Sequence, residues 1–379
     1  QGAQPENQKL TTVTLLPEKS LSLVTSLPSR SLPWKLGNLS ALVAAPALFG
    51  MPALDASTLK CVDAGKELLS MLSCPNGHRK NAIWEQYDSM VQLHTIAGPG
   101  EPAAIVEVPE TKRACVLTME AEPYKCWTDP YTGAAEAMAL SLRGVWLSGA
   151  DALGMTNCLN FASPEFPEKF YELKECLRGL ADTCRALDCP VVSGNVSLYN
   201  ETANDRIYPT PLVVTAGLAV ERGKLMRAGR TEAGDLLYLV GPKEGSLGAT
   251  RYQEAKDGKP LGKTCAPDYE AEKKFRDAAL ATAHGQLAKS GRVVAGGGLA
   301  TALANEAIAS ETGMKLTLAP ETTVEALLFS EGGPRAVYAV APEKAAEFEN
   351  AWKALGFVKI GEAGIPSTGT ESCPCPSLS

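Results

Sequence analysis

An amphipathic helix that leads directly into a strand is the feature that most constrains how this chain folds. Between residues 164 and 187, apolar side chains recur at alternating steps of four and three, which places them on one helical stripe. The stripe consists of Phe166, Phe170, Leu173, Leu177, Leu180, Cys184 and Leu187. Ser163 can cap the N-terminus, and Pro164 suits the first helical position. The apolar run from Cys189, directly after the helix, predicts a buried strand.

Strand and helix patterns alternate on both sides of this pair, and such alternation is typical of an α/β domain. It runs from residue 103 to residue 220, and a glycine-rich, charged boundary at 223–234 separates it from a second unit of strands and helices. We therefore expect an α/β (α+β) fold with two consecutive domains. The expected boundaries are 1–59 for a poorly defined lead, 60–95 for linker helices, 96–222 and 223–364 for the two domains, and 365–379 for a frayed tail.

The linker is predicted to hold two helices, at 60–72 and 80–94. In the second helix one side would carry Ile83, Tyr87, Met90, Val91 and His94. We interpret this histidine as a packed or partly exposed helix residue rather than as a metal ligand.

Charge and cysteine usage exclude several classes of protein. A net charge of -7 without a basic cluster argues against a nucleic-acid surface. The 11 cysteines are scattered singly, so reduced thiols in a cytosolic protein are the simplest interpretation. The most apolar stretch, 41–54, is interrupted by prolines and too short to span a membrane. Because the sequence begins with Gln1, we expect a piece of a longer chain or a processed product.

Residues 193–201 concentrate oxygen ligands and small hydrogen-bond donors directly after the predicted strand. Six polar or turn-forming residues occur there: Ser193, Gly194, Asn195, Ser197, Asn200 and Glu201. A strand that releases such a loop can hold phosphate together with Mg²⁺. An Asn- and Ser-rich turn between two strands explains the same pattern, and the pattern alone leaves both interpretations open.

Two glycine-rich segments resemble phosphate loops, and neither is a P-loop. Residues 258–264 fail the spacing, because the required first glycine falls on Asp257. Gly296, Gly297 and Gly298 precede a predicted helix and could present backbone N–H groups to an anion, although a tight strand-to-helix turn is the favoured interpretation. The chain also lacks GxSxG and HExxH elements, which removes support for serine hydrolases and zincins.

Several motifs occur together in a fixed order and carry a resemblance to a known family. Residues 155–161 read MTNCLNF, residues 190–201 read PVVSGNVSLYNE, and residues 208–211 read YPTP. Upstream lie WEQYD at 84–88 and AGPG at 97–100, and downstream lies LFSE at 328–331 with Arg335. Over about residues 60–364 the chain resembles phosphoribosylformylglycinamidine synthase, the ATP-dependent amidotransferase of purine biosynthesis.

The resemblance implies both architecture and activity. The family consists of two homologous halves, each with an N-terminal-type and then a C-terminal-type domain of the aminoimidazole ribonucleotide synthetase kind, and this chain resembles the second half. The implied activity is the ATP- and Mg²⁺-dependent conversion of formylglycinamide ribonucleotide to formylglycinamidine ribonucleotide. The implied partners are a first-half synthase domain or subunit and a glutaminase that supplies ammonia. The family's catalytic histidine belongs to the first half, so no catalytic residue is expected here, and the chain alone would be an inactive ligase component. We expect it in the cytoplasm, without a nucleic-acid polymer or membrane partner.

Four residues match functional positions of the family. The resemblance implies that Asn157 and Gly194 contact ATP, that Asn195 binds magnesium and that Ser197 contacts the substrate. Asn157 departs from the family pattern, which has an aspartate there, and the change removes a charge.

Other departures concern an auxiliary nucleotide and Mg²⁺ site that some members hold in this half. Its acidic position after the Gly-Pro-Gly turn falls at Pro102, and its Glu and Asn on the next helix fall near Leu140 and Gly144. Its Asp-rich segment falls at 293–296. We therefore predict that this auxiliary site does not bind Mg²⁺ and nucleotide. These losses also support an alternative, in which the chain is a non-catalytic structural half that supports a catalytic partner.

Overall fold

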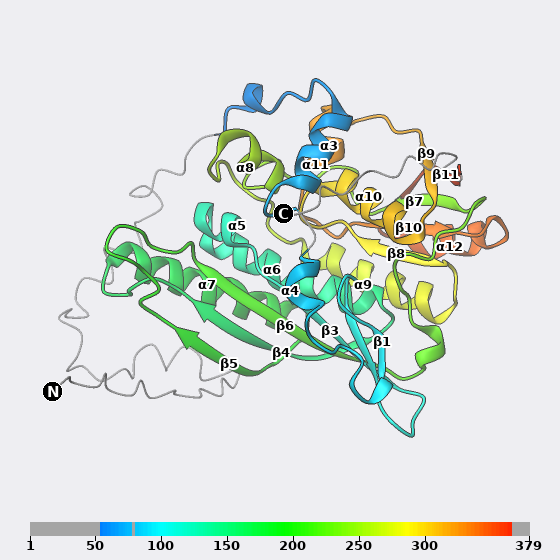
Figure 1. Ribbon diagram of the computed structural model, residues 1–379, viewed down its shortest axis with the longest axis horizontal. Helices are drawn as coiled ribbons and strands as arrows, with labels where there is room; N and C mark the ends of the chain where they lie inside the picture. Colours follow the sequence, from blue (N-terminus) through cyan, green and yellow to red (C-terminus); the bar gives the residue numbers. More distant parts are fainter. Residues whose placement is uncertain (1–53, 78–79, 366–379) are drawn as a thin grey trace.

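The computed structural model describes residues 54–77 and 80–365, and places them in two sheets with helices packed against them (Figure 1). The first sheet has six strands in the order β1-β2-β3-β6-β4-β5. The second has five in the order β8-β10-β7-β11-β9. This α/β (α+β) architecture with two consecutive units confirms the predicted fold class. The expected lead up to residue 53 and the tail from residue 366 lie outside the described residues.

The first sheet combines antiparallel strands with one parallel pair at its edge. Its strands are β1 (Thr95–Ala97), β2 (Ala104–Glu107), β3 (Ala114–Glu120), β4 (Asp151–Asn160), β5 (Val191–Ser197) and β6 (Thr210–Ala219). Helix α7 (Pro167–Ala186) connects β4 to the parallel β5, because parallel neighbours need a crossover. Figure 1 shows α7 and α6 (Pro130–Leu147) lying along one face of β4, β5 and β6. A short helix, α5 (Pro123–Thr128), precedes α6.

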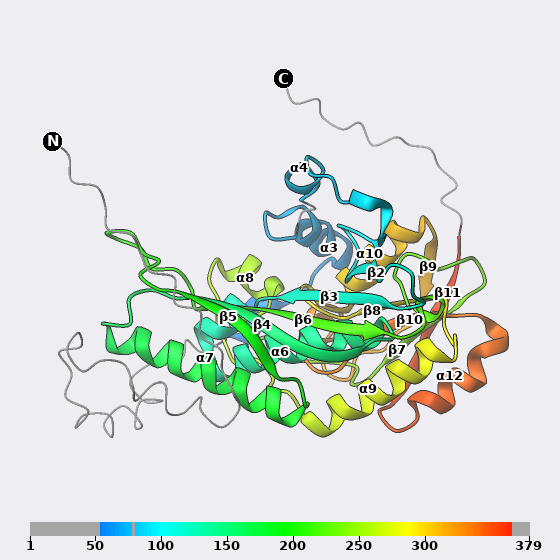
Figure 2. The ribbon, with the colours of Figure 1, turned by 90° about the horizontal axis from the view of Figure 1, so that it is seen from below.

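The second sheet is antiparallel throughout and carries helices from both sides. Its strands are β7 (Leu236–Val240), β8 (Ser290–Val293), β9 (Gly313–Leu316), β10 (Ala336–Val340) and β11 (Phe357–Ile365). Its helices are α8 (Arg251–Asp257), α9 (Tyr269–His284), α10 (Gly298–Ser310), α11 (Val324–Phe329) and α12 (Ala345–Trp352). In Figure 2, α9 and α12 lie below the sheets and α10 lies above.

One hydrophobic core joins the two units. The largest buried cluster contains Trp146 and Met138 of α6 together with Phe275 of α9 and Trp352 of α12. The ring of Phe275 lies edge-on to that of Trp352 at 5.4 Å. Because α6 belongs to the first unit and α9 to the second, burial of this apolar surface holds the two units together.

The long helix begins later than predicted. It starts at Pro167 with Phe166 as the residue before it, rather than at Pro164 after a Ser163 cap. A residue that precedes proline is pushed out of the helical region, and Phe166 is extended with φ -84° and ψ 124°. The Ser163 hydroxyl instead accepts from the backbone N–H of Glu165 at 3.3 Å. The predicted cap was therefore wrong, although the helix itself is confirmed.

The strand after this helix is also different from the prediction. β5 is the edge strand of its sheet, and Val192 and Val196 are 59% and 49% exposed, so it is not a buried strand. Residues 193–197 lie in the strand itself, and the loop begins only after Ser197. An apolar run cannot by itself distinguish a central strand from an edge strand, because the distinction depends on what pairs with it.

The prediction of a second linker helix was wrong as well. Residues 80–94 contain only a four-residue helix, α4 (Asn81–Trp84), and a 3-10 turn at Val91–Leu93. The apolar side chains predicted to share one buried side are exposed, with Tyr87 at 69% and Val91 at 64%. His94 lies beside β1, and its Nδ1 is 2.8 Å from Oε1 of Glu107. The first linker helix is confirmed as α3 (Ala64–Ser73).

No helix in the described part of the chain is both long and apolar enough to cross a membrane.

A buried ion triad reinforces the contact between the two units. Arg143 of α6 is fully buried and pairs with Glu136 of the same helix at 2.7 Å. It also donates to both carboxylate oxygens of Glu272 on α9, with its Nε 2.9 Å from Oε2. Two carboxylates and one guanidinium are thus removed from water together, and each depends on the others for its partners.

Replacing Arg143 by methionine is expected to reduce the free energy of unfolding by about 3–5 kcal/mol, because two buried carboxylates would lose their counter-ion. Urea unfolding followed by circular dichroism measures this loss. The control is Arg185→Met: Arg185 pairs with Asp182 at 2.9 Å, and the two side chains are 52% and 39% exposed, so its loss should stay below about 1 kcal/mol. Equal losses in the two variants would contradict the role assigned to the triad.

Candidate functional site

Two of the predicted site residues, Asn157 and Gly194, lie directly side by side. They are register partners in the parallel β4–β5 pair. A Cβ atom added to Gly194 would lie 2.4 Å from Oδ1 of Asn157, so only glycine leaves space for this side chain. Asn157 is 8% exposed and follows the same alternation as the core residues Met155 and Leu159. Both residues therefore belong to the face of the sheet that the helices cover.

The other two, Asn195 and Ser197, lie on the opposite face. They pair with Cys158 and Asn160 of β4, and side chains of successive strand residues point to opposite faces. Asn195 is exposed, and the Ser197 hydroxyl donates to Oδ1 of Asn200 at 3.2 Å. The structure thus brings the four residues onto one strand pair but divides them between its faces. A role for Asn195 and Ser197 requires a ligand or partner that approaches the open face.

The remaining polar residues of this stretch stabilise the loop that follows β5. Asn200 donates through Nδ2 to the backbone carbonyls of Phe161 and Ser197, at 3.0 and 2.8 Å. Glu201 accepts from the backbone N–H of Ser163 at 3.2 Å and lies 3.4 Å from Nε of Arg206. Asn200 and Glu201 therefore satisfy backbone groups of the turn, which matches the turn interpretation for this part of the stretch.

The same loop reaches a cavity of about 630 Å³ between the two units. The cavity is lined from the first unit by Glu122 and Tyr124, and from the second by Arg251 and Glu331. Further lining residues are Asn76, Ala121, Pro123, Arg206, Ile207, Tyr208, Thr210 and Ala249. Tyr124 and Tyr208 meet edge to face with ring centroids 5.8 Å apart, and Asn76 donates to the Tyr124 hydroxyl at 2.7 Å.

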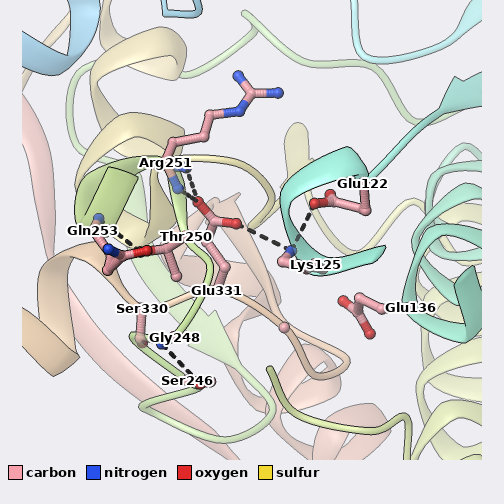
Figure 3. A network of polar contacts seen from close by, with 12 residues as sticks. Glu122, Lys125, Glu136, Ser246, Gly248, Thr250, Arg251, Gln253, Ser330 and Glu331 are labelled. Atoms are coloured by element: carbon pink, nitrogen blue, oxygen red, sulfur yellow. Dashed lines mark hydrogen bonds and ion pairs between the residues drawn. The ribbon is translucent and has the colours of Figure 1, made fainter. Parts of the chain in front are cut away.

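A buried lysine links two carboxylates that line this cavity, as Figure 3 shows for the network of polar contacts. Nζ of Lys125, in α5, lies 3.0 Å from Oε2 of Glu122 and 3.0 Å from Oε2 of Glu331. Burial alone would lower the pKa of Lys125, but the charges of Glu122 and Glu331 raise it above its ordinary value. The ammonium therefore stays protonated at neutral pH.

Glu331 also occupies the anion position that the glycine-rich segment could have offered to a ligand. Its Oε1 accepts from the backbone N–H of Gly297 at 2.8 Å and of Arg251 at 2.9 Å. These donors lie at the starts of α10 and α8, where backbone N–H groups lack helical partners. Burial alone would raise the pKa of Glu331, but Lys125, Arg251 and these donors hold it below its ordinary value. The chain's own carboxylate thus fills the triple-glycine turn.

Two positions of the auxiliary site, Leu140 and Gly144, lie on α6. Leu140 is 3% exposed in the middle of α6. One turn later, a Cβ atom on Gly144 would lie 2.8 Å from the methyl group of Thr118. Among the described residues, no group of three or more His, Cys, Asp or Glu side chains is arranged to hold a metal ion. The absence of a Mg²⁺–nucleotide complex here stays a prediction.

Sequence reasoning missed the residues that form the cavity's charged end. Glu122 and Lys125 are three positions apart, a spacing that signals a pair on one helix, but this segment had not been predicted as a helix. Glu331 was noticed only as part of a motif. Its partners Lys125, Arg251 and Gly297 lie 206, 80 and 34 positions away in the sequence, so no local pattern could have connected them.

Each of the two units matches a known protein-family model. Residues 100–219 match the family model described as "AIR synthase related protein, N-terminal domain", and residues 232–365 match "AIR synthase related protein, C-terminal domain".

Curated proteins similar to this chain carry the name phosphoribosylformylglycinamidine synthase subunit PurL. The one from Thermoanaerobacter sp. (strain X514) is 37% identical over 285 residues, which are 75% of this chain and 39% of that protein. The one from Moorella thermoacetica is 39% identical over 281 residues, 74% of this chain and 38% of that protein. The chain thus spans about two fifths of the length of the curated relatives it matches.

Solved structures agree on the fold. The chain matches "T. maritima PurL complexed with FGAR" with a TM-score of 0.65 at 17% identity, over 80% of this chain and 50% of that one. It matches "Structure of PurLQS from Thermotoga maritima" with a TM-score of 0.54 at 19% identity, over 76% of this chain and 41% of that one. Both domain types match in order, so this chain belongs to the AIR synthase related proteins, and the curated relatives to which it is similar are PurL subunits.

Proposed function

We propose that this chain is the second half of a phosphoribosylformylglycinamidine synthase and lends residues of β5 to an active site shared with a first half. The reaction is the ATP-dependent conversion of formylglycinamide ribonucleotide to formylglycinamidine ribonucleotide with glutamine-derived ammonia. The observation that carries the proposal is 37% identity to a PurL subunit over 75% of this chain, a match that includes little more than a third of that subunit. Domain boundaries at 96–222 and 223–364 remain part of the proposal.

The position of Asn195 and Ser197 supports a shared site. Both lie on the face of an edge strand that the helices of the described residues do not cover. Asn157 and Gly194 lie on the other face of the same strand pair, and we assign them to ATP. Neutral Asn157 keeps a donor and an acceptor for a nucleotide but lacks the charge of the family's aspartate.

Magnesium would need ligands from outside the chain. The ion takes six oxygen ligands in octahedral geometry, and the described residues gather no acidic cluster for it. Asn195 could supply one carboxamide oxygen, and the first half, the nucleotide phosphates and water would have to supply the rest. The residues present therefore do not fit a complete Mg²⁺ site within this chain. For this reason we assign Asn195 only to a Mg²⁺ site that this chain shares with the first half.

The uncovered sheet face offers a surface for the first half. Thr118 of β3 and Thr215 of β6 contact Ser141 of α6, so they face the helices. Their neighbours Leu117, Met119 and Val214 must then point to the other face, where Met119 is 65% exposed. An apolar sheet face of this kind commonly marks a protein–protein contact.

The test is to combine the chain with a first-half partner and measure formylglycinamide ribonucleotide- and ammonia-dependent ATP hydrolysis. Asn195→Ala and Ser197→Ala are each expected to reduce kcat/KM on the order of 100-fold, since each removes a group that positions a charged reactant. The matched control is Ser193→Ala, an exposed serine on the same face of the same strand, which should stay within a few-fold of wild type. A non-catalytic structural half would tolerate all three substitutions, and that outcome would replace the proposal by the alternative.

A second test concerns the partner surface. Met119→Glu is expected to weaken binding to the first half at least tenfold, because it places a charge in an apolar contact, while the chain's own stability changes by less than about 0.5 kcal/mol. Isothermal titration calorimetry measures the affinity. Ile308→Glu is the control, since Ile308 is 54% exposed on α10 of the second unit, which is not part of this sheet. Unchanged affinity in Met119→Glu would place the first half elsewhere.

A further inference from the structure

The contact between α5 and the loop before β10 has an unusual composition. Two carboxylates meet there from different units: Glu122 from the first and Glu331 from the second. Only Lys125 stands between them, and it is 1% exposed. Figure 3 shows its side chain directed between the two carboxylates, and Arg251 directed away from them.

A cation is required at this point. Two ionised carboxylates in a buried contact repel each other, and neither can be left without a counter-charge at low cost. The crowding of acidic groups extends to Glu120, at the end of β3, where burial and repulsion from Glu122 raise the pKa of the carboxyl to about 7. In many proteins a divalent metal ion bridges carboxylates in such a place. Here the chain provides an ammonium group.

The position of Glu331 is fixed independently of the lysine. Its other oxygen is held by the backbone N–H groups of Gly297 and Arg251, and its own backbone exchanges two hydrogen bonds of 2.9 Å with Ser246. The carboxylate therefore cannot swing away to water if the cation is lost. Whatever cation binds here connects α5 to three segments of the second unit.

We propose that Lys125 is a built-in cation that does the work of a bridging divalent metal ion, and so keeps the cleft between the two units assembled without metal or nucleotide. The inference does not depend on the proposed function, because it concerns only contacts within this chain. It identifies Lys125 as a positioning residue that sets the shape of the cavity lined by Glu122, Arg251 and Glu331.

The experiment compares two substitutions of Lys125 by thermal unfolding, in EDTA and in millimolar MgCl₂ or MnCl₂. Lys125→Ala removes the ammonium and leaves space for an ion, so its melting temperature should fall by several degrees in EDTA and rise again with Mg²⁺ or Mn²⁺. Lys125→Met fills the space with an uncharged chain and should stay low in every buffer. Wild type should melt at the same temperature in all of them. Electron paramagnetic resonance should count one more bound Mn²⁺ in Lys125→Ala than in wild type.

Two controls separate a counter-ion from a packing contact. Lys169→Met removes a buried lysine that pairs with one carboxylate, Glu172 of its own helix, at 2.7 Å and lies 4.8 Å over the ring of Trp127; it should confer no response to divalent cations. The double variant Lys125→Met/Glu331→Gln should melt higher than Lys125→Met alone, because it no longer buries an unpaired carboxylate; a packing role predicts additive losses. This comparison of melting temperatures also tests the proposal if Lys125→Ala fails to fold. A wild type stabilised by Mg²⁺ as much as Lys125→Ala, or a Lys125→Ala variant indifferent to both ions, would overturn the proposal.

Discussion

The contact between α6 and α9 is the constraint on which the rest of this structure depends. Trp146 and Met138 on one side and Phe275 on the other bury a continuous apolar surface, and Arg143 links the same two helices through Glu272. Apolar burial supplies the free energy but is non-directional, whereas a guanidinium that bonds both oxygens of a carboxylate fixes orientation. The two units consequently have one relative position, and the cavity between them has a defined shape.

Within that frame, the parallel β4–β5 pair determines what the first unit presents to its surroundings. The α7 crossover places β5 at the sheet edge, so one face of the strand lies beside the helices and the other is open. Gly194 lies beside Asn157 on the face that the helices cover, and position 194 is a glycine because a side chain at this position would collide with the asparagine. Asn195 and Ser197 point away from the fold that supports them.

The charged end of the inter-unit cavity shows a different principle. Positions that could have held an anion and a cation are filled by side chains of the chain itself, Glu331 at the helix starts and Lys125 between the carboxylates. Buried charges persist only when each has a partner, so these residues form one unit rather than separate contacts. The cavity beside them is also lined by Arg251, Arg206 and two tyrosines.

Local sequence determined much of this protein: the stripe of α7, the strand that follows it, the two-unit order and the family resemblance all follow from short-range patterns and ordered motifs. Prediction from local sequence failed where the structure depends on contacts between residues that are far apart in the chain. Helix α7 begins at Pro167 because the residue before a proline disfavours helical backbone angles. Strand β5 is an edge strand rather than a buried one because no described strand pairs with its outer side. The apolar residues at 83–91 suggested a helix, but no described surface covers them. Only the tertiary structure placed Lys125 between Glu122 and Glu331, and divided Asn157 and Gly194 from Asn195 and Ser197, because burial, register and charge pairing are properties of surfaces brought together by folding.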